Sequence, residues 1–309
     1  MKKKIFIIIS LIIALILLLI LVFIQINNLR DTNKNLHIQM KKLSSYQNLD
    51  INQKNDTDSS VEANISSSTY LANTRKKEIQ NRIETYGENE NGIPVLMYHF
   101  FFDSSSGERG KDNNFLDITK FEQQLKYLKE NDFFFPNFEE LSQFIDRKIE
   151  LPKKSVILTI DDGDESFFTL AVPIIEKYQV PVTSFIITSE CDSNTIKQYQ
   201  SNFIHFESHS HNLHQAEKNG KGLLVNLSYE KTYEDIEKSV TILNSKEAFC
   251  YPFGHYNNTA KQVLKDIDYK VAFTTNGGKV KPGMNPLELP RVRILKEDSL
   301  SGFMTKVEN

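Results

Sequence analysis

Two patterns of hydrophobic and polar positions divide this chain. From residue 93 onward, short apolar runs alternate with segments whose apolar positions recur at helical spacing. The run at 156–160 hardly alternates with polar residues, which is typical of a parallel strand covered on both faces. This alternation of strands and helices predicts an α/β fold, either a barrel or an open sheet. We expect strands within residues 94–101, 155–160, 182–188, 203–207, 248–251 and 270–275, and helices within residues 118–131, 137–146, 166–178, 229–243 and 257–266.

The N-terminus is continuously apolar over the length of a membrane span. Lysines at positions 2–4 precede residues 5–24, in which Ser10 is the one polar residue. About twenty helical residues extend about 30 Å, the thickness of a bilayer's hydrocarbon core. The following residues lack a small-residue cleavage site, so we expect an uncleaved transmembrane anchor at 5–26 with residues 1–4 in the cytoplasm. A removed signal peptide is the alternative, and it leads to the same extracellular destination.

A polar segment separates this anchor from the α/β pattern. Residues 27–92 are rich in Asn, Ser, Thr, Gln and Lys and predict an extracellular stalk, which leaves residues 93–309 for one catalytic domain. We expect this domain to be monomeric. The net charge is −3 and the basic residues are interspersed with acidic ones, which argues against a nucleic-acid partner.

Two adjacent acids follow the strand expected at 155–160. Asp161 and Asp162 precede Gly163, which permits a sharp turn. Consecutive side chains at a strand end point in different directions, so one carboxylate can bind a cation while the other faces a water molecule. An Asp-Asp-Gly string is usually only a turn. A turn, however, does not need two acids directly after a buried strand.

Histidines cluster after the strand expected at 203–207. His209 and His214 are five residues apart, so a helix would place them about 140° apart, and they can share a metal ion only on a loop or strand end. One carboxylate and two imidazoles suit a divalent cation, most often Zn²⁺, although Co²⁺, Ni²⁺ and Fe²⁺ also fit. His211 lies between them and is a substrate contact, a support for a ligand or, ranked last, a third ligand.

Four strings occur in the order of the signatures of one enzyme family. The segments at 94–99, 158–163, 208–214 and 251–254 resemble those of the polysaccharide deacetylases, also known as the NodB-homology or carbohydrate esterase family 4 group. The resemblance covers about residues 93–295 and implies a deformed (β/α) barrel of about seven strands. The five-residue step between the histidines is similar to the branch that deacetylates poly-N-acetylglucosamine.

The resemblance also implies roles for individual residues. Asp162, His209 and His214 would hold the divalent cation, and Asp161 would be the catalytic base that takes a proton from the attacking water. The family uses a backbone N–H of the 251–254 motif to stabilise the oxyanion, and we assign this role to the N–H of Tyr251.

Two departures from the family pattern matter. Where many members carry an arginine that holds the base, this chain has Cys250, and we expect Arg291 or Arg293 to replace that arginine. The histidine that usually acts as general acid is missing, because no histidine follows His255. His99 is our preferred general acid, and a structural brace beneath the metal site is the equal alternative.

The two cysteines are Cys191 and Cys250, both after expected strands. In an extracellular domain they could form a disulfide, but spacing along the chain does not establish bridging distance. Two buried thiols are the favoured alternative.

The sequence therefore predicts an anchored extracellular, metal-dependent hydrolase that removes N-acetyl groups from a cell-envelope glycan. Poly-N-acetylglucosamine, peptidoglycan and a wall-polysaccharide linkage sugar all fit as substrates. The enzymatic alternative is an O-acetyl esterase with the same metal site, since esters need less help at the leaving group. The other alternative, a catalytically silent wall-binding barrel, is disfavoured because the acids and histidines of the motifs are intact.

Overall fold

The computed structural model describes residues 59–217 and 220–308, with side chains from residue 72 onward. The expected cytoplasmic tip at 1–4 and anchor at 5–26 lie outside these residues. Within the described segments, we find no helix that combines the length and the apolar composition needed to cross a membrane. The barrel and the candidate site lie in the second of two compact units, Lys77–Asn309.

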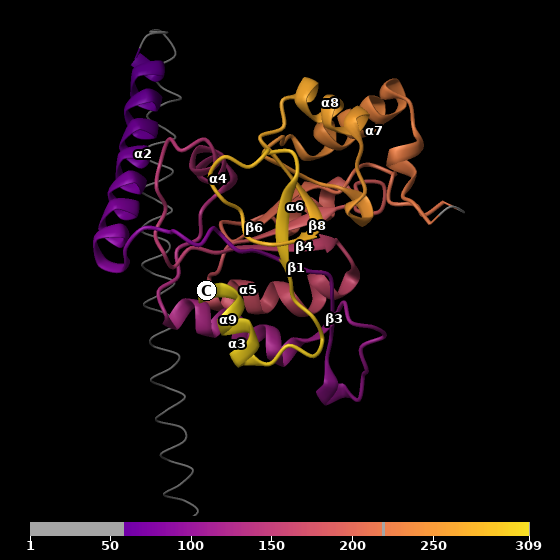
Figure 1. Ribbon diagram of the computed structural model, residues 1–309, viewed down its shortest axis with the longest axis horizontal. Helices are drawn as coiled ribbons and strands as arrows, with labels where there is room; N and C mark the ends of the chain where they lie inside the picture. Colours follow the sequence, from indigo (N-terminus) through magenta and orange to yellow (C-terminus); the bar gives the residue numbers. More distant parts are fainter. Residues whose placement is uncertain (1–58, 218–219, 309) are drawn as a thin grey trace, which may run out of the picture. The chain divides into compact units, whose positions relative to one another are not determined.

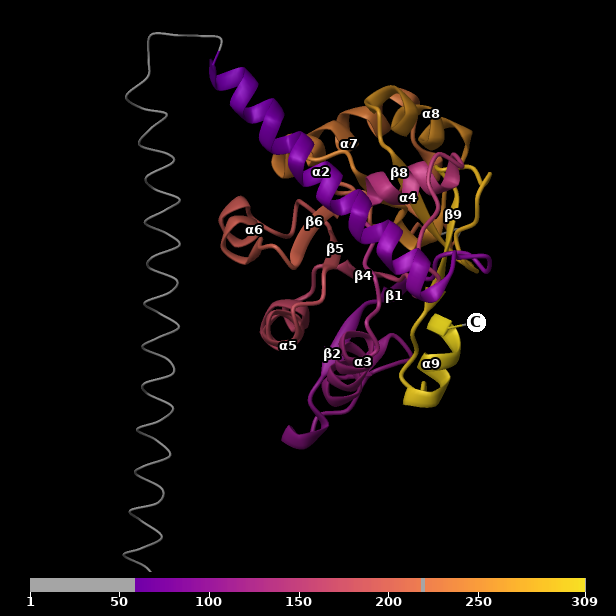
Figure 2. The same cartoon turned by 90° about the vertical axis from the view of Figure 1, so that its left-hand side faces the viewer.

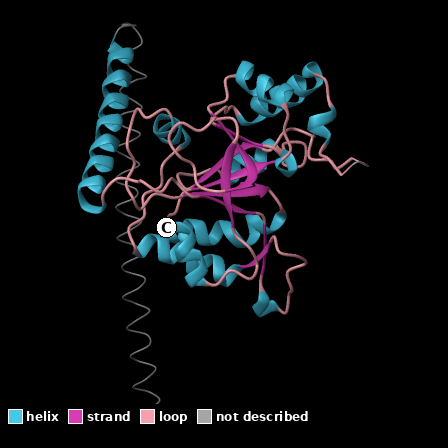
Figure 3. Cartoon of the chain, viewed as in Figure 1, coloured by secondary structure: helices cyan, strands magenta, loops and turns pink. Residues whose placement is uncertain are grey.

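Seven parallel strands of the described chain close into a barrel (Figures 1 and 3). Their order is β1-β4-β5-β6-β7-β8-β9, and β9 pairs with β1 to complete the ring. The expected α/β barrel of about seven strands is thus confirmed. The bounds are β1 Val95–Tyr98, β4 Ile157–Asp162, β5 Val182–Ile186, β6 Ile204–Ser208, β7 Ala248–Cys250, β8 Val271–Gly277 and β9 Leu289–Arg293.

Helices cover the barrel from outside. Figures 1 and 2 show α3, α5 and α9 together on one side of the strands, with α7 and α8 on the opposite side. The helices are α2 Ser59–Tyr86, α3 Ile118–Glu130, α4 Phe138–Ile145, α5 Val172–Tyr178, α6 Ser193–Tyr199, α7 Tyr229–Leu243, α8 Asn258–Ile267 and α9 Leu300–Glu308. Four short helical turns are η1 Ser104–Ser106, η2 Phe167–Ala171, η3 Leu223–Asn226 and η4 Pro252–Gly254. A separate small sheet consists of β2 Phe100–Phe102 and β3 Phe115–Asp117.

Side chains along each strand alternate between the barrel interior and the outer helices. In β4, Leu158 and Ile160 join the core that includes α3 and α5, whereas Ile157 belongs to a second core that includes α4. Phe138 of α4 belongs to this second core and packs against Phe185 of β5 and Phe273 of β8. Asp161 lies further along the inward face of β4, so its carboxylate reaches the interior at the carboxyl end, where α/β barrels place their sites.

The expected polar stalk at 27–92 contains a helix, α2, whose last turns belong to the barrel unit. Arg82 Nη2 lies 3.1 Å from Asp132 Oδ1, and the Tyr86 hydroxyl donates to Asp132 Oδ2 at 2.9 Å. These contacts attach the C-terminal end of α2 to the loop after α3.

Candidate metal centre

The end of β4 separates the two adjacent acids. Asp162 has a φ of 76°, a left-handed conformation that is uncommon for a residue with a side chain, and Gly163 follows with a φ of 70°. A Cβ at Gly163 would lie 2.7 Å from Cγ2 of Ile186, so only glycine fits there. Asp161 therefore faces the barrel interior while Asp162 turns away from it, as predicted for adjacent carboxylates. Such strain is typical of functional sites.

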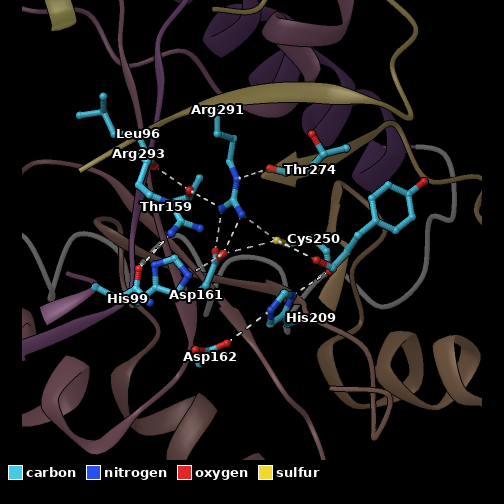
Figure 4. Close-up of polar contacts among 12 residues, drawn as sticks. Leu96, His99, Thr159, Asp161, Asp162, His209, Cys250, Thr274, Arg291 and Arg293 are labelled. Carbon is cyan, nitrogen blue, oxygen red and sulfur yellow. Dashed lines mark hydrogen bonds and ion pairs between the residues drawn. The ribbon is translucent and has the colours of Figure 1, made fainter. Parts of the chain in front are cut away.

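Asp162 meets the two predicted histidine ligands. Its Oδ1 lies 3.4 Å from His209 Nε2 and 3.5 Å from His214 Nε2 (Figure 4 shows the contact with His209). The histidines lie on the loop after β6, where Ser210 adopts a φ of 74°. One ligand atom from each residue lies within 4.8 Å of the others. The two histidines, five residues apart, thus converge on a loop, as expected because a helix would point them in different directions.

The chemistry of this cluster fits a cation. Nδ1 of His209 lies 2.7 Å from the carbonyl oxygen of Cys250, and because that oxygen can only accept, Nδ1 carries the proton. In the neutral ring, Nε2 then presents a lone pair to Asp162 Oδ1, a buried atom without a hydrogen-bond partner among the described residues. Two acceptors at this distance need positive charge between them. One carboxylate and two imidazoles suit a divalent metal ion.

Arg291 of β9 holds Asp161 in the barrel interior (Figure 4). Its Nη1 and Nη2 atoms donate to the two carboxylate oxygens at 2.7 and 2.6 Å, in a bidentate pair. The guanidinium is itself fixed by the Thr274 carbonyl at 3.0 Å and the Thr159 hydroxyl at 3.0 Å. Burial alone would raise the pKa of Asp161, but Arg291 outweighs it and holds that pKa well below its usual range. Asp161 is therefore ionised at neutral pH.

The structure distinguishes the two candidate arginines. Arg293 is exposed and donates to Asn114 Oδ1 at 3.2 Å, so it does not reach the base. Cys250 Sγ lies 3.1 Å from Arg291 Nη2. The thiol of Cys250 therefore lies next to the guanidinium of Arg291, which reaches the base from β9. Cys191 and Cys250 are both buried free thiols, which confirms the favoured alternative to a disulfide.

His99 lies at the edge of this pair. Its Nε2 is 3.8 Å from Asp161 Oδ2, too long for a hydrogen bond, and 14% of its side chain is exposed. Burial lowers the pKa of His99 despite the nearby carboxylates, so the ring is neutral near pH 7. This position is compatible with both roles considered for His99. His211 contacts the Thr188 hydroxyl through Nδ1 at 3.1 Å and is not among the converging ligand atoms.

The assignment of an oxyanion donor to Tyr251 requires correction. Its N–H donates to the carbonyl of Phe273 at 3.1 Å, because the hydrogen bonding between β7 and β8 continues past Cys250. The side chain is fully buried, and its hydroxyl donates to the Leu287 carbonyl at 3.0 Å. Neither donor of Tyr251 is available to a substrate.

The same turn, η4, offers a different donor. Pro252 has no N–H, and the N–H groups of Gly254 and His255 bond to carbonyls within the turn at 2.8 and 3.0 Å. The N–H of Phe253, whose φ is 58°, has no acceptor among the described residues. The Phe253 ring stacks on His214 with centroids 4.2 Å apart, which places it beside the metal cluster. The proline at 252 was the signal in the sequence, because it leaves Phe253 as the next N–H of the motif.

A parallel barrel with an Asp-His-His cluster beside an arginine-bound carboxylate defines the class of metal-dependent hydrolases. Comparison with known proteins identifies the family. A family model described as polysaccharide deacetylase matches residues 148–272. The poly-β-1,6-N-acetyl-D-glucosamine N-deacetylase of Staphylococcus aureus strain MSSA476 is 30% identical over 234 residues, which cover 66% of this chain and 79% of that relative. The chain therefore belongs to the polysaccharide deacetylase family, as its motifs predicted.

Solved structures agree with this assignment. The Streptococcus pyogenes deacetylase PplD, in complex with acetate, has a TM-score of 0.61 at 27% identity, covering 71% of this chain and 99% of PplD. IcaB from Ammonifex degensii has a TM-score of 0.62 at 24% identity, covering 72% of this chain and 99% of IcaB, and shares its fold.

Proposed function

We propose that this chain removes N-acetyl groups from β-1,6-linked poly-N-acetylglucosamine at the cell surface. The observation that carries the proposal is the pairing of a cation-seeking cluster, Asp162 with His209 and His214, with an ionised Asp161 held by Arg291. The substrate class is supported by the name of the Staphylococcus aureus relative and by the five-residue step between the histidines.

Each residue of the site has a distinct role in this proposal. Asp162, His209 and His214 would hold a divalent ion, for which Zn²⁺ is our choice, and when bound it would polarise the acetamide carbonyl and acidify a coordinated water. Asp161 accepts the proton of the attacking water, and Arg291 keeps its carboxylate ionised and oriented.

The N–H of Phe253 is our candidate donor to the oxyanion that forms on the acetamide. A preorganised donor of this kind contributes about 3 kcal/mol to transition-state stabilisation. The leaving amine needs a proton, and we assign its delivery to His99, whose neutral ring lies 3.8 Å from Asp161 Oδ2 and can pass on the proton that Asp161 takes from the attacking water.

Incubation of the full chain with poly-β-1,6-N-acetylglucosamine oligomers and Zn²⁺ tests this function. Mass spectrometry should detect a loss of about 42 Da per converted sugar, the mass difference of amide hydrolysis by the proposed chemistry, together with new primary amines. Asp161→Asn and Asp162→Ala should abolish both signals.

Other outcomes identify the alternatives. Activity on purified peptidoglycan or wall polysaccharide but not on the oligomers would replace the proposed substrate. Acetate released without free amine would identify the O-acetyl esterase, which the absence of a histidine after His255 favours. A metal-loaded chain that is inactive on every fraction would identify the silent wall-binding barrel.

We further propose a single-pass membrane protein with residues 1–4 inside, an anchor at 5–26, a stalk at 27–92 and a monomeric extracellular catalytic domain at 93–309. The apolar run and the lysines before it support the anchor. Protease treatment of intact cells should remove the catalytic domain while leaving a membrane-bound fragment. A domain protected from the protease would contradict this topology.

A further inference from the structure

The loop that carries both histidine ligands is held by a carboxylate from α7. Asp235 Oδ1 accepts the backbone N–H of His211 at 2.8 Å, and its Oδ2 accepts the N–H of Asn212 at 3.0 Å. Both peptide groups lie between His209 and His214 in the chain. One side chain of a different element therefore binds the N–H groups in the middle of the ligand loop, where the carbonyls of Ser210 and His211 accept the N–H groups of Thr188 and Ser189 at 3.2 and 3.0 Å.

This loop has little support from regular structure. β6 ends at Ser208, whose pairing with Phe249 is the one register contact between β6 and β7, and residues 209–214 form neither helix nor strand. At its start, the N–H of His209 donates to the Ile186 carbonyl at 2.9 Å. Toward its end, the N–H of Leu213 donates to the Ser210 hydroxyl at 3.0 Å. Between them, the N–H of Ser210 donates to the Ser208 hydroxyl at 3.1 Å, and the N–H groups of His211 and Asn212 have the Asp235 carboxylate as their acceptor.

Charge makes this contact stronger than an ordinary turn bond. A carboxylate that accepts two N–H groups makes charge-assisted hydrogen bonds, which are about twice as strong as neutral ones. The left-handed φ of 74° at Ser210 also has to be stabilised by the surrounding contacts.

We propose that Asp235 is a positioning residue that sets the metal affinity of the site by fixing the ligand loop. Its carboxylate keeps the loop in the shape in which Nε2 of His209 and of His214 both face Asp162. Groups that orient metal ligands typically change metal affinity by about 10- to 100-fold when they are replaced. This inference rests on the metal site of the proposed function.

Metal titration of the full chain tests the role of Asp235. After removal of metal with a chelator, Zn²⁺ affinity is measured by competition with a chromophoric chelator, and Co²⁺ absorption bands report the ligand geometry. Asp235→Ala should weaken Zn²⁺ binding about 10- to 100-fold and alter the Co²⁺ spectrum. Asp235→Asn retains one acceptor oxygen and should lose less Zn²⁺ affinity than Asp235→Ala. Asp235→Glu retains the carboxylate and should also bind Zn²⁺ more tightly than Asp235→Ala.

Glu234→Ala is the matched control. Glu234 lies on the same helix, is exposed, and pairs with Lys238 at 3.0 Å, so this variant should bind Zn²⁺ like the wild type. Equal affinities for Asp235→Ala and Glu234→Ala would overturn the inference while leaving the proposed function intact. A wild-type chain that binds neither metal would overturn the proposed metal site itself. Circular dichroism checks folding, and if Asp235→Ala does not fold, the affinities of Asp235→Asn and Asp235→Glu decide.

Discussion

Replacing Arg291 with methionine isolates the buried ion pair of the candidate site. Methionine has a similar length but no charge, so the carboxylate of Asp161, a residue that is 2% exposed, would remain in the barrel interior without a cation. Removing one partner of a buried ion pair typically costs about 3–5 kcal/mol, because the other charge is left uncompensated. We therefore expect Arg291→Met to lower the free energy of unfolding by about this amount at pH 7.

The loss of unfolding free energy caused by Arg291→Met should depend on pH in a defined direction. In the wild type, Arg291 depresses the pKa of Asp161, so the pair stabilises the fold above the unfolded pKa and this contribution disappears as the pH falls through the depressed pKa. Without Arg291, burial raises that pKa above the ordinary 3.8, so the variant loses stability as the pH rises from there. The difference between the two proteins should therefore grow as the pH rises from 4 to 7.

Urea unfolding between pH 4 and pH 7, with a chelator present so that metal binding does not contribute, measures this difference. Arg293→Met is the matched control, because Arg293 lies two residues along the same strand but is exposed, and its effect should stay within about 0.5 kcal/mol. Asp161→Asn combined with Arg291→Met should be more stable than Arg291→Met alone. Equal costs for the two arginine variants, or a cost independent of pH, would refute the reasoning.

Three further predictions concern the rest of the site. Asp162→Ala should weaken Zn²⁺ binding by more than about 100-fold, since it removes a ligand and not just its support, and a titration indistinguishable from wild type would rule out the ligand set. Burial raises the pKa of Glu207 from 4.5 to about 8, so the wild type should lose up to about 1.4 kcal/mol of unfolding free energy per pH unit in that interval. Glu207→Gln should remove this slope in urea unfolding, whereas parallel pH profiles would contradict it. Tyr251→Phe should lose about 1 kcal/mol of stability, with deacetylation kinetics unchanged, and a large fall in kcat would place its hydroxyl in the reaction.

The convergence of Asp162, His209 and His214 was predictable because parallel strands end at the same edge of a sheet. Asp162 follows β4 and His209 follows β6, so residues far apart in sequence are brought to one end of the barrel. The spacing of His209 and His214 excluded a helix and thereby required the loop on which they converge. The positions of the motifs and the direction of the strands were sufficient to predict that these side chains meet, since neither depends on the detailed packing of the core.

The choice between Arg291 and Arg293 was not predictable from the strand pattern. Residues two apart on a strand point to the same face, so both arginines face the barrel axis if either does. What separates them is depth, because Arg293 is level with Met97 and exposed at the rim, whereas Arg291 lies one step deeper and is fully buried. β9 itself was not expected, since Pro290 and the two arginines interrupt its apolar run.

Which backbone N–H of the 251–254 motif lacks an acceptor in the described chain depends on a still finer detail, the residue at which the hydrogen bonding between β7 and β8 ends. The motif placed a turn after β7, but whether Tyr251 belongs to the ladder or to the turn is decided by β8, whose Phe273 carbonyl takes the Tyr251 N–H. Asp235 shows the same limit over a longer range, because nothing in the local sequence of α7 relates it to the loop after β6. Such groups act through backbone atoms of other segments, so the residue types in a motif do not predict them. A search for supporting residues in this family therefore has to begin from the hydrogen bonds made to the ligand loop.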